Sequence, residues 1–168
     1  MTDFNDMIEG YRGFYRNDWE AHRQRWEELT EGQSPQVMVI SCSDSRVDPA
    51  LVFNSKPGEI FVVRNVAALV PPFETSPGFH GVSAAIEFAV QFLKVPEIVV
   101  MGHGRCGGCN AALTGNVADT GHGEGAHIAD WVRMLRDAKK KVAEEYGTEG
   151  RDAGRAMELA GVRVSLNN

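Results

Sequence analysis

Three short runs of apolar, mostly β-branched residues constrain the fold of this chain more than any other feature of its sequence. They occupy residues 37–40, 60–63 and 98–101. Each run is apolar without alternation, which is typical of strands buried on both faces, as in a parallel sheet. The segments between the runs have helical patterns, so strands and helices alternate. We therefore expect an α/β fold with a central, mostly parallel sheet, flanked by helices and joined by right-handed crossovers.

The segments between and after these runs contain signals for helices and loops. Asp48 followed by Pro49 predicts the start of a short helix after the first run. Residues 83–93 and 128–146 place apolar side chains at helical spacing, and each segment predicts an amphipathic helix. Residues 115–125 are rich in glycine and predict a loop.

Both ends of the chain have patterns of their own. Residues 4–29 carry aromatic side chains at helical spacing without proline, which predicts a helical arm within residues 1–30. These aromatic residues either belong to the core or pack on another subunit. Residues 162–166 have strand character close to the last residue, so we expect another segment to cover this edge or a C-terminal part to be missing. No repeat or linker is present, and we expect a single domain over residues 1–168.

Composition excludes several classes of function. The chain has 17 Lys and Arg against 23 Asp and Glu, a net charge of −6, and such a chain is poorly suited to nucleic acid. No apolar run approaches the roughly 18 residues of a membrane-spanning helix, and the acidic N-terminus does not resemble a secretory signal. We expect a cytoplasmic protein with no membrane partner. Three cysteines, Cys42, Cys106 and Cys109, favour metal binding or thiol chemistry over a disulfide framework.

Two polar clusters follow the first and third runs directly. The first cluster contains Cys42, Asp44 and Arg46, which point to one side of an extended segment. The second contains His103 and Cys106, which can face the same point at a strand-to-helix turn. Both leave the carboxyl ends of neighbouring parallel strands, where ligands bind in open α/β sheets. Together they supply two thiols and an imidazole that can hold zinc with one open position, beside an Asp–Arg pair.

Other interpretations of these residues stay open. Gly102, Gly104 and Gly107 form a G-x-G-x-x-G pattern between an apolar run and a helix, which is also typical of an NAD-binding oxidoreductase. Cys106 and Cys109 match C-x-x-C, which fits a non-catalytic structural zinc module. The net charge and the long separation of the two clusters disfavour such a module.

The residues of both clusters resemble those of the β-class carbonic anhydrases. The resemblance covers the chain from about Gln33 to Asn110 and includes the following segments in the family's order: residues 32–35, 42–46, 57–59, 61–67, 84–87 and 102–108, with a weaker match at 164–167. It implies one zinc ion per chain, held by Cys42, His103 and Cys106, with Asp44 and Arg46 acting as a dyad. The implied activity is the reversible hydration of carbon dioxide to bicarbonate and a proton, carried out by a zinc-stabilised hydroxide.

The same resemblance implies a substrate pocket and a partner. Gln33 would hydrogen-bond the substrate oxygens, and Phe61 and Val66 would form an apolar wall beside carbon dioxide. Phe88 lies where many members have a tyrosine, so a role of that hydroxyl is absent here. Strand and helix periodicity alone would place Phe61, Val66 and Phe88 in the core. Members of the family are homodimers or larger assemblies in which helical arms embrace the partner and the site lies near the subunit boundary.

Overall fold

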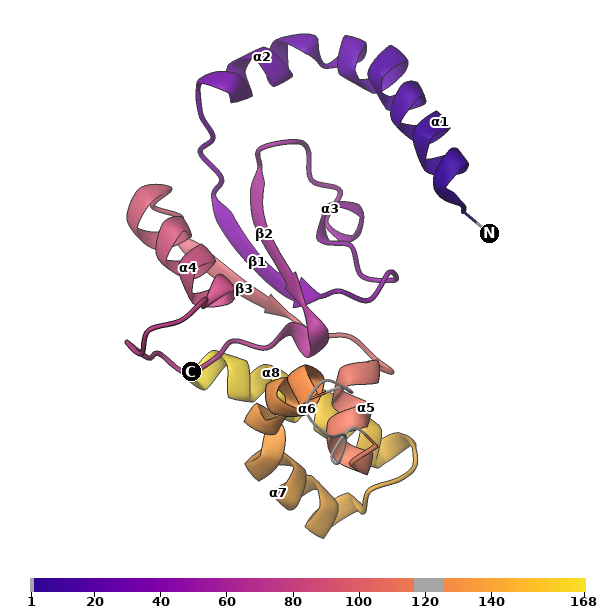
Figure 1. Ribbon diagram of the computed structural model, residues 1–168, viewed down its shortest axis with the longest axis vertical. Coiled ribbons are helices and arrows are strands. Elements are labelled where there is room, and N and C mark those ends of the chain that lie inside the picture. Colours follow the sequence, from indigo (N-terminus) through magenta and orange to yellow (C-terminus); the bar gives the residue numbers. More distant parts are fainter. Residues whose placement is uncertain (1, 117–125) are drawn as a thin grey trace.

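The computed structural model describes residues 2–116 and 126–168 and contains a three-stranded parallel sheet (Figure 1). Its strands are β1 (Val37–Cys42), β2 (Ile60–Asn65) and β3 (Glu97–Met101), in the order β2-β1-β3. β1 is central, and its residue Val37 lies opposite Ile60 on one side and Glu97 on the other. The predicted α/β class and the three predicted strands are confirmed, each strand extending slightly beyond its predicted run.

Helices join the strands where the turn signals place them. Asp48 caps α3 (Pro49–Val52), and its side chain accepts hydrogen bonds from the backbone N–H groups of Ala50 and Leu51. α4 (Gly81–Glu87) continues as the π-helical turn η3 (Phe88–Phe92). This helical segment covers one face of the sheet, because Ala85, Ile86 and Ala89 pack with Met38 and Ile40 of β1.

The remaining helices gather at the carboxyl ends of the strands (Figure 1). They are α5 (Gly107–Thr114), α6 (Ala126–Val132), η4 (Arg133–Leu135), α7 (Arg136–Tyr146) and α8 (Arg151–Asn167). The predicted helix over residues 128–146 is therefore interrupted by the 3-10 turn η4. The predicted loop over residues 115–125 lies largely outside the described residues. A second core cluster forms between these helices and the strand ends, and it contains all three cysteines.

The prediction of strand character at residues 162–166 is wrong. These residues belong to α8, whose buried positions Met157, Gly161 and Ser165 are spaced by four residues along one helical face. Val162 and Val164 favour a strand locally, but burial of a helical face against α5 and the sheet overrides that preference. Consequently α8 adds no strand edge to the sheet. It crosses beneath the strand ends instead (Figure 1).

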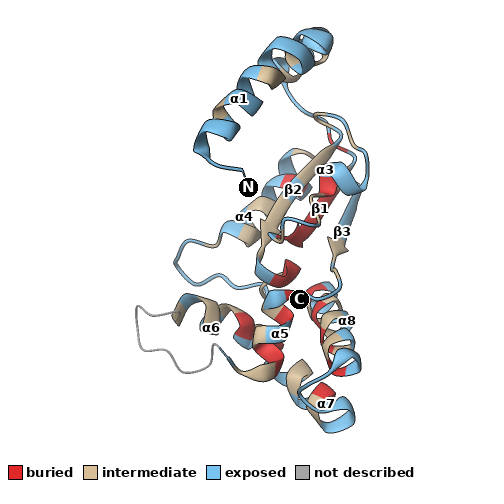
Figure 2. Cartoon of the chain, turned by 90° about the vertical axis from the view of Figure 1, so that its right-hand side faces the viewer, coloured by how far each residue is buried: buried red, intermediate tan, exposed pale blue. Residues whose placement is uncertain are grey.

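The N-terminal arm is helical, as predicted, and projects from the rest of the chain (Figure 2). It consists of α1 (Phe4–Phe14), the π-helical turn η1 (Tyr15–Trp19) and α2 (Arg23–Glu31), none of which has a buried residue. Its aromatic rings stack on one another, with Trp19 and Trp26 at 5.4 Å between centroids. Among the helices of the described residues, none combines the length and hydrophobicity that crossing a bilayer requires.

Candidate metal centre

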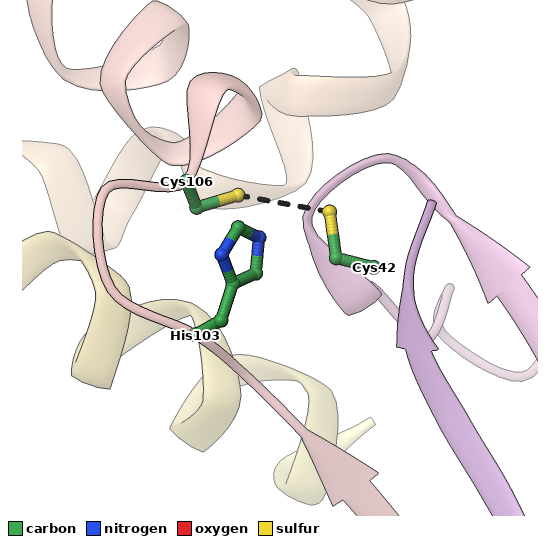
Figure 3. Close-up of side chains that lie close together, drawn as sticks. All are labelled: Cys42, His103 and Cys106. Carbon is green, nitrogen blue, oxygen red and sulfur yellow. Dashed lines mark hydrogen bonds between the residues drawn. The ribbon is translucent and has the colours of Figure 1, made fainter. Parts of the chain in front are cut away.

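Three side chains with metal-ligating atoms meet at the carboxyl end of the sheet (Figure 3). Cys42 is the last residue of β1, His103 follows β3 by two residues, and Cys106 is the N-cap of α5. β1 and β3 are parallel neighbours whose ends coincide, so the loops that leave them lie side by side. The ligand atoms of the three residues lie within 4.8 Å of one another. The two Sγ atoms are 3.9 Å apart.

The imidazole of His103 is oriented as a metal ligand would be. Its Nδ1 lies 3.0 Å from the carbonyl oxygen of Gly104, and donation to that acceptor places the proton on Nδ1. Nε2 then carries a lone pair, yet it is buried without a hydrogen-bond partner. A buried nitrogen without a partner is costly in free energy. Zinc bound between Nε2 and the two sulfur atoms would remove that cost, so these residues fit the ion.

The environments of the sulfur atoms differ. Burial raises the pKa of the Cys42 thiol, although the backbone N–H groups of Asp44 and Ala67 favour its thiolate. A hydrogen bond from the Cys109 thiol holds the pKa of Cys106 below its usual range, and backbone N–H groups at the start of α5 add to this effect. The pKa of Cys109 is raised, because its thiol donates a hydrogen bond to Cys106 and because it is buried. Cys109 therefore acts as a neutral donor to Cys106 and lies outside the three-residue cluster.

Asp44 and Arg46 form the predicted pair beside this cluster. Nε and Nη2 of Arg46 donate to the two carboxylate oxygens of Asp44 at 2.8 and 2.7 Å, and the Arg46 backbone N–H donates to Oδ1 at 3.0 Å. These bonds hold the pKa of Asp44 well below its usual range. Nη2 of Arg46 also donates to the carbonyl of Arg105, at 3.1 Å, which connects the loop after β1 to the loop after β3.

Arg64 stabilises the loop after β1, a role that sequence reasoning missed. Its guanidinium donates to the carbonyls of Cys42 and Asp44, at 3.1 and 2.7 Å, and to the carboxylate of Asp48, at 2.8 Å. One side chain of β2 thereby fixes both ends of the segment that carries Cys42 and Asp44. An arginine near the end of an apolar strand was the only signal for this role, and its partners lie far away in the sequence.

The segment that follows β2 packs against the start of α5, beside the Cys42, His103 and Cys106 cluster. Ala67 and Ala68 have positive φ angles of 66° and 54°, which strain residues with a Cβ atom. Val66 and Ala67 pack on Gly108 of α5, where an added Cβ would lie 2.6 Å from Val66 Cγ1 and 3.0 Å from Ala67 Cβ. Gly108 is therefore required for the close approach of α5 to this segment.

Gly108→Ala is expected to lower the free energy of unfolding by about 1–3 kcal/mol, because the methyl group overpacks this contact. Gly107→Ala is the matched control, since an added Cβ at that position meets nothing within 4 Å. Urea unfolding of the wild type and both variants measures the difference. Equal stability of the two variants would contradict the close packing described here.

The predicted substrate-pocket residues fall into two places. Val66 lies beside Gly108, near the metal centre. Phe61 pairs with Met38 near the start of β1, and its ring contacts Phe88 at 5.9 Å between centroids. Gln33 precedes β1 and lines a surface hollow together with Phe88. Cys42 pairs with Asn65 at the other end of the sheet, so within one chain Gln33, Phe61 and Phe88 do not border the metal centre.

Comparison with known proteins identifies the family of this chain. The family model described as carbonic anhydrase matches residues 37–168, and the chain belongs to the β-carbonic anhydrase family. A carbonic anhydrase of Synechococcus elongatus is 34% identical over 163 residues, which are 96% of this chain and 58% of the relative. The chain thus spans little more than half the length of that curated relative.

Solved structures of the family have the same fold. The β-carbonic anhydrase CcaA superposes with a TM-score of 0.87 at 32% identity, over 98% of this chain and 72% of CcaA. A tetrameric β-carbonic anhydrase of the fungus Sordaria macrospora superposes with a TM-score of 0.77 at 30% identity, over 98% and 81% of the two chains. The alternative NAD-binding interpretation lacks its second strand, because only helices follow β3 in the described part of the chain.

Proposed function

We propose that the protein catalyses the reversible hydration of carbon dioxide to bicarbonate and a proton, with one zinc ion held by Cys42, His103 and Cys106. The observation that carries this proposal is the convergence of two sulfur atoms and the partnerless Nε2 of His103, beside an ionised aspartate. Family membership supports it, since the S. elongatus relative is named a carbonic anhydrase. The three free cysteines also support a location in a reducing compartment, the cytoplasm.

The three ligands determine how acidic a bound water can become. Bound zinc would supply Lewis acidity, lowering the pKa of a water molecule at its fourth position. Two thiolates neutralise the formal charge of the ion, so we propose that this water is less acidic than in sites with only neutral ligands. The hydrogen bonds that Cys106 receives from Cys109 and from backbone N–H groups withdraw some charge from one sulfur and partly offset this effect.

Asp44 accepts a hydrogen bond or a proton from the reacting water in this proposal. The backbone N–H and Nε of Arg46 donate to Oδ1 of Asp44 and use both lone pairs of that oxygen. Nη2 of Arg46 donates to Oδ2 and uses one of its two lone pairs. Oδ2 therefore keeps one free acceptor position. Because Arg46 holds the pKa of Asp44 low, the carboxylate stays ionised and in one orientation throughout the neutral range. Its free lone pair can then orient the water toward carbon dioxide.

Turnover of the zinc-loaded chain is expected to rise from neutral toward alkaline pH. Since Asp44 is already ionised there, the rise reflects ionisation of the water itself. Stopped-flow carbon dioxide hydration between about pH 6 and 9 measures the profile of kcat/KM, with chelator-treated protein as the control. A flat profile, or turnover that survives removal of zinc, would contradict the proposed activity.

We further propose that a second copy of the chain completes the substrate pocket. Gln33, Phe61 and Phe88 lie away from the metal centre of their own chain, and Phe88 is 43% exposed. The arm exposes further apolar side chains, among them Phe4 at 75% and Tyr11 at 67%. These surfaces fit a homodimer in which each copy supplies its Gln33 and Phe88 to the metal centre of the other. Two such dimers could associate into a tetramer, the state named for the S. macrospora enzyme.

Sedimentation of the zinc-loaded chain tests this arrangement. We expect a dimer or larger assembly, and we expect that mixing inactive Gln33→Ala and Cys42→Ser chains restores part of the turnover, because a mixed dimer contains one intact site. A fully active monomer would contradict the shared pocket.

A further inference from the structure

Helix α8 contacts the loop after β3 and the segment after β2, although it contributes none of the three proposed ligands. Its buried face carries Met157, Gly161 and Ser165. A Cβ added to Gly102, the residue directly after β3, would lie 2.5 Å from Val162 of α8. Gly161 faces the sulfur of Cys109, which would lie 3.5 Å from an added Cβ. The helix is therefore packed tightly against the segment between β3 and α5 that carries His103 and Cys106, and rotation or translation of α8 would disturb that segment.

Glu158 connects α8 to the loop that carries His103 and Cys106. Its Oε1 accepts a hydrogen bond from the backbone N–H of Cys106, at 3.2 Å. Cys106 is the N-cap of α5, so this N–H is outside the helical hydrogen-bond pattern and needs another acceptor. Glu158 supplies that acceptor and fixes the peptide group next to the ligating sulfur.

Ser165, two turns further along α8, connects the helix to the segment after β2. Its hydroxyl donates to the carbonyl of Ala68, at 3.0 Å, and accepts from the N–H of Val70, at 3.1 Å. Ser165 is only 4% exposed, so water cannot replace these bonds. They stabilise the strained backbone of Ala67 and Ala68. Ala67 in turn directs its N–H at the sulfur of Cys42.

We propose that Glu158 and Ser165 are positioning residues that set the separation of the two ligating sulfur atoms. α8 holds the Cys106 loop through Glu158 and the segment that contacts Cys42 through Ser165. The two residues lie seven positions, or about two turns, apart on nearly the same helical face. A hydrogen-bond partner placed behind a metal ligand typically changes metal affinity by about 10–100-fold. This role rests on the zinc ligation proposed above, and it does not depend on turnover.

The Glu158 series tests the first contact. Glu158→Ala is expected to weaken zinc binding about 10-fold in a competition titration with a chromophoric chelator, because the Cys106 N–H loses its acceptor. Glu158→Gln keeps an acceptor oxygen and should retain affinity within about 2-fold of the wild type. Arg163→Ala, an exposed position of the same helix, is the control and should leave zinc affinity unchanged. Equal weakening by Ala and Gln would overturn the hydrogen-bond role of Glu158.

Ser165→Ala tests the second contact and is expected to weaken zinc binding by a similar factor. It should also shift the visible bands of the cobalt-substituted protein, since the sulfur positions change, whereas a merely structural residue would lower the melting temperature alone. Should Ser165→Ala fail to fold, the Glu158 series decides the proposal. Unchanged zinc affinity in both Glu158→Ala and Ser165→Ala would overturn it. Failure of the proposed activity is seen separately, as zinc-loaded wild type that does not hydrate carbon dioxide.

Discussion

Cys42→Ser is expected to abolish stoichiometric zinc binding and, with it, at least about 99% of carbon dioxide hydration. Serine keeps the size of the side chain but offers a hydroxyl that is not deprotonated near neutral pH, so one of three ligands is lost. Its neighbours Cys106 and His103 are then left with an incomplete coordination set. Metal analysis after gel filtration and stopped-flow hydration of the same samples measure both effects.

Cys109→Ala is the matched control for that variant. Cys109 is buried in the same core cluster as Cys42 and Cys106, yet its thiol is not a member of the three-residue group. We expect this variant to retain about one zinc ion per chain with a modest loss of stability. If Cys42→Ser retained its zinc and Cys109→Ala lost it, the wrong sulfur atoms would have been assigned as zinc ligands.

Asp44→Asn is expected to lower kcat by about 100-fold or more while zinc content stays at the wild-type value. The amide has the shape of the carboxylate but presents a donor on one side and cannot take up a proton, and general acid–base contributions are typically 10²–10⁴-fold. Arg46 also loses one of its two charge-assisted bonds, so the orientation of the group is less fixed. Hydration kinetics across the alkaline range, together with metal analysis, separate this loss from a loss of zinc.

Ser45→Ala, an exposed change in the same loop, is the control for Asp44→Asn and should retain full turnover. Near-normal kcat in Asp44→Asn would show that the dyad serves only to hold the loop after β1, through the bond from Arg46 to the Arg105 carbonyl.

The strands and the convergence of Cys42, His103 and Cys106 could be predicted because their signals are local. Continuous apolar runs identified β1, β2 and β3. Cys42 ends β1 and His103 follows β3, and the ends of neighbouring parallel strands lie side by side, so these two side chains were expected to meet. No tertiary information was needed beyond the rule that parallel strands end at one edge.

The role of α8 could not be predicted in this way. Val162 and Val164 have strand propensity, and only packing of Gly161 and Ser165 against distant segments makes them helical. Glu158 and Ser165 bond to residues 52 and 97 positions away, so no short pattern in the sequence contains both partners.

The substrate pocket shows a different limit. Resemblance to a family assigns roles to Gln33, Phe61 and Phe88 without saying which copy of the chain they serve. The parallel register places Phe61 four residues before the Cys42 end of the sheet, which at about 3.3 Å per residue is roughly 13 Å away. Within one chain these residues therefore lie away from the Cys-His-Cys cluster, which is why we propose that a second copy supplies them.

Zinc K-edge X-ray absorption of the loaded wild type tests the central claim most directly. The arrangement of Cys42, His103 and Cys106 predicts two sulfur atoms at about 2.3 Å and two nitrogen or oxygen atoms at about 2.0–2.1 Å, one of them an exchangeable water. Three sulfur atoms in the first coordination shell, or a folded chain that takes up no zinc, would contradict it.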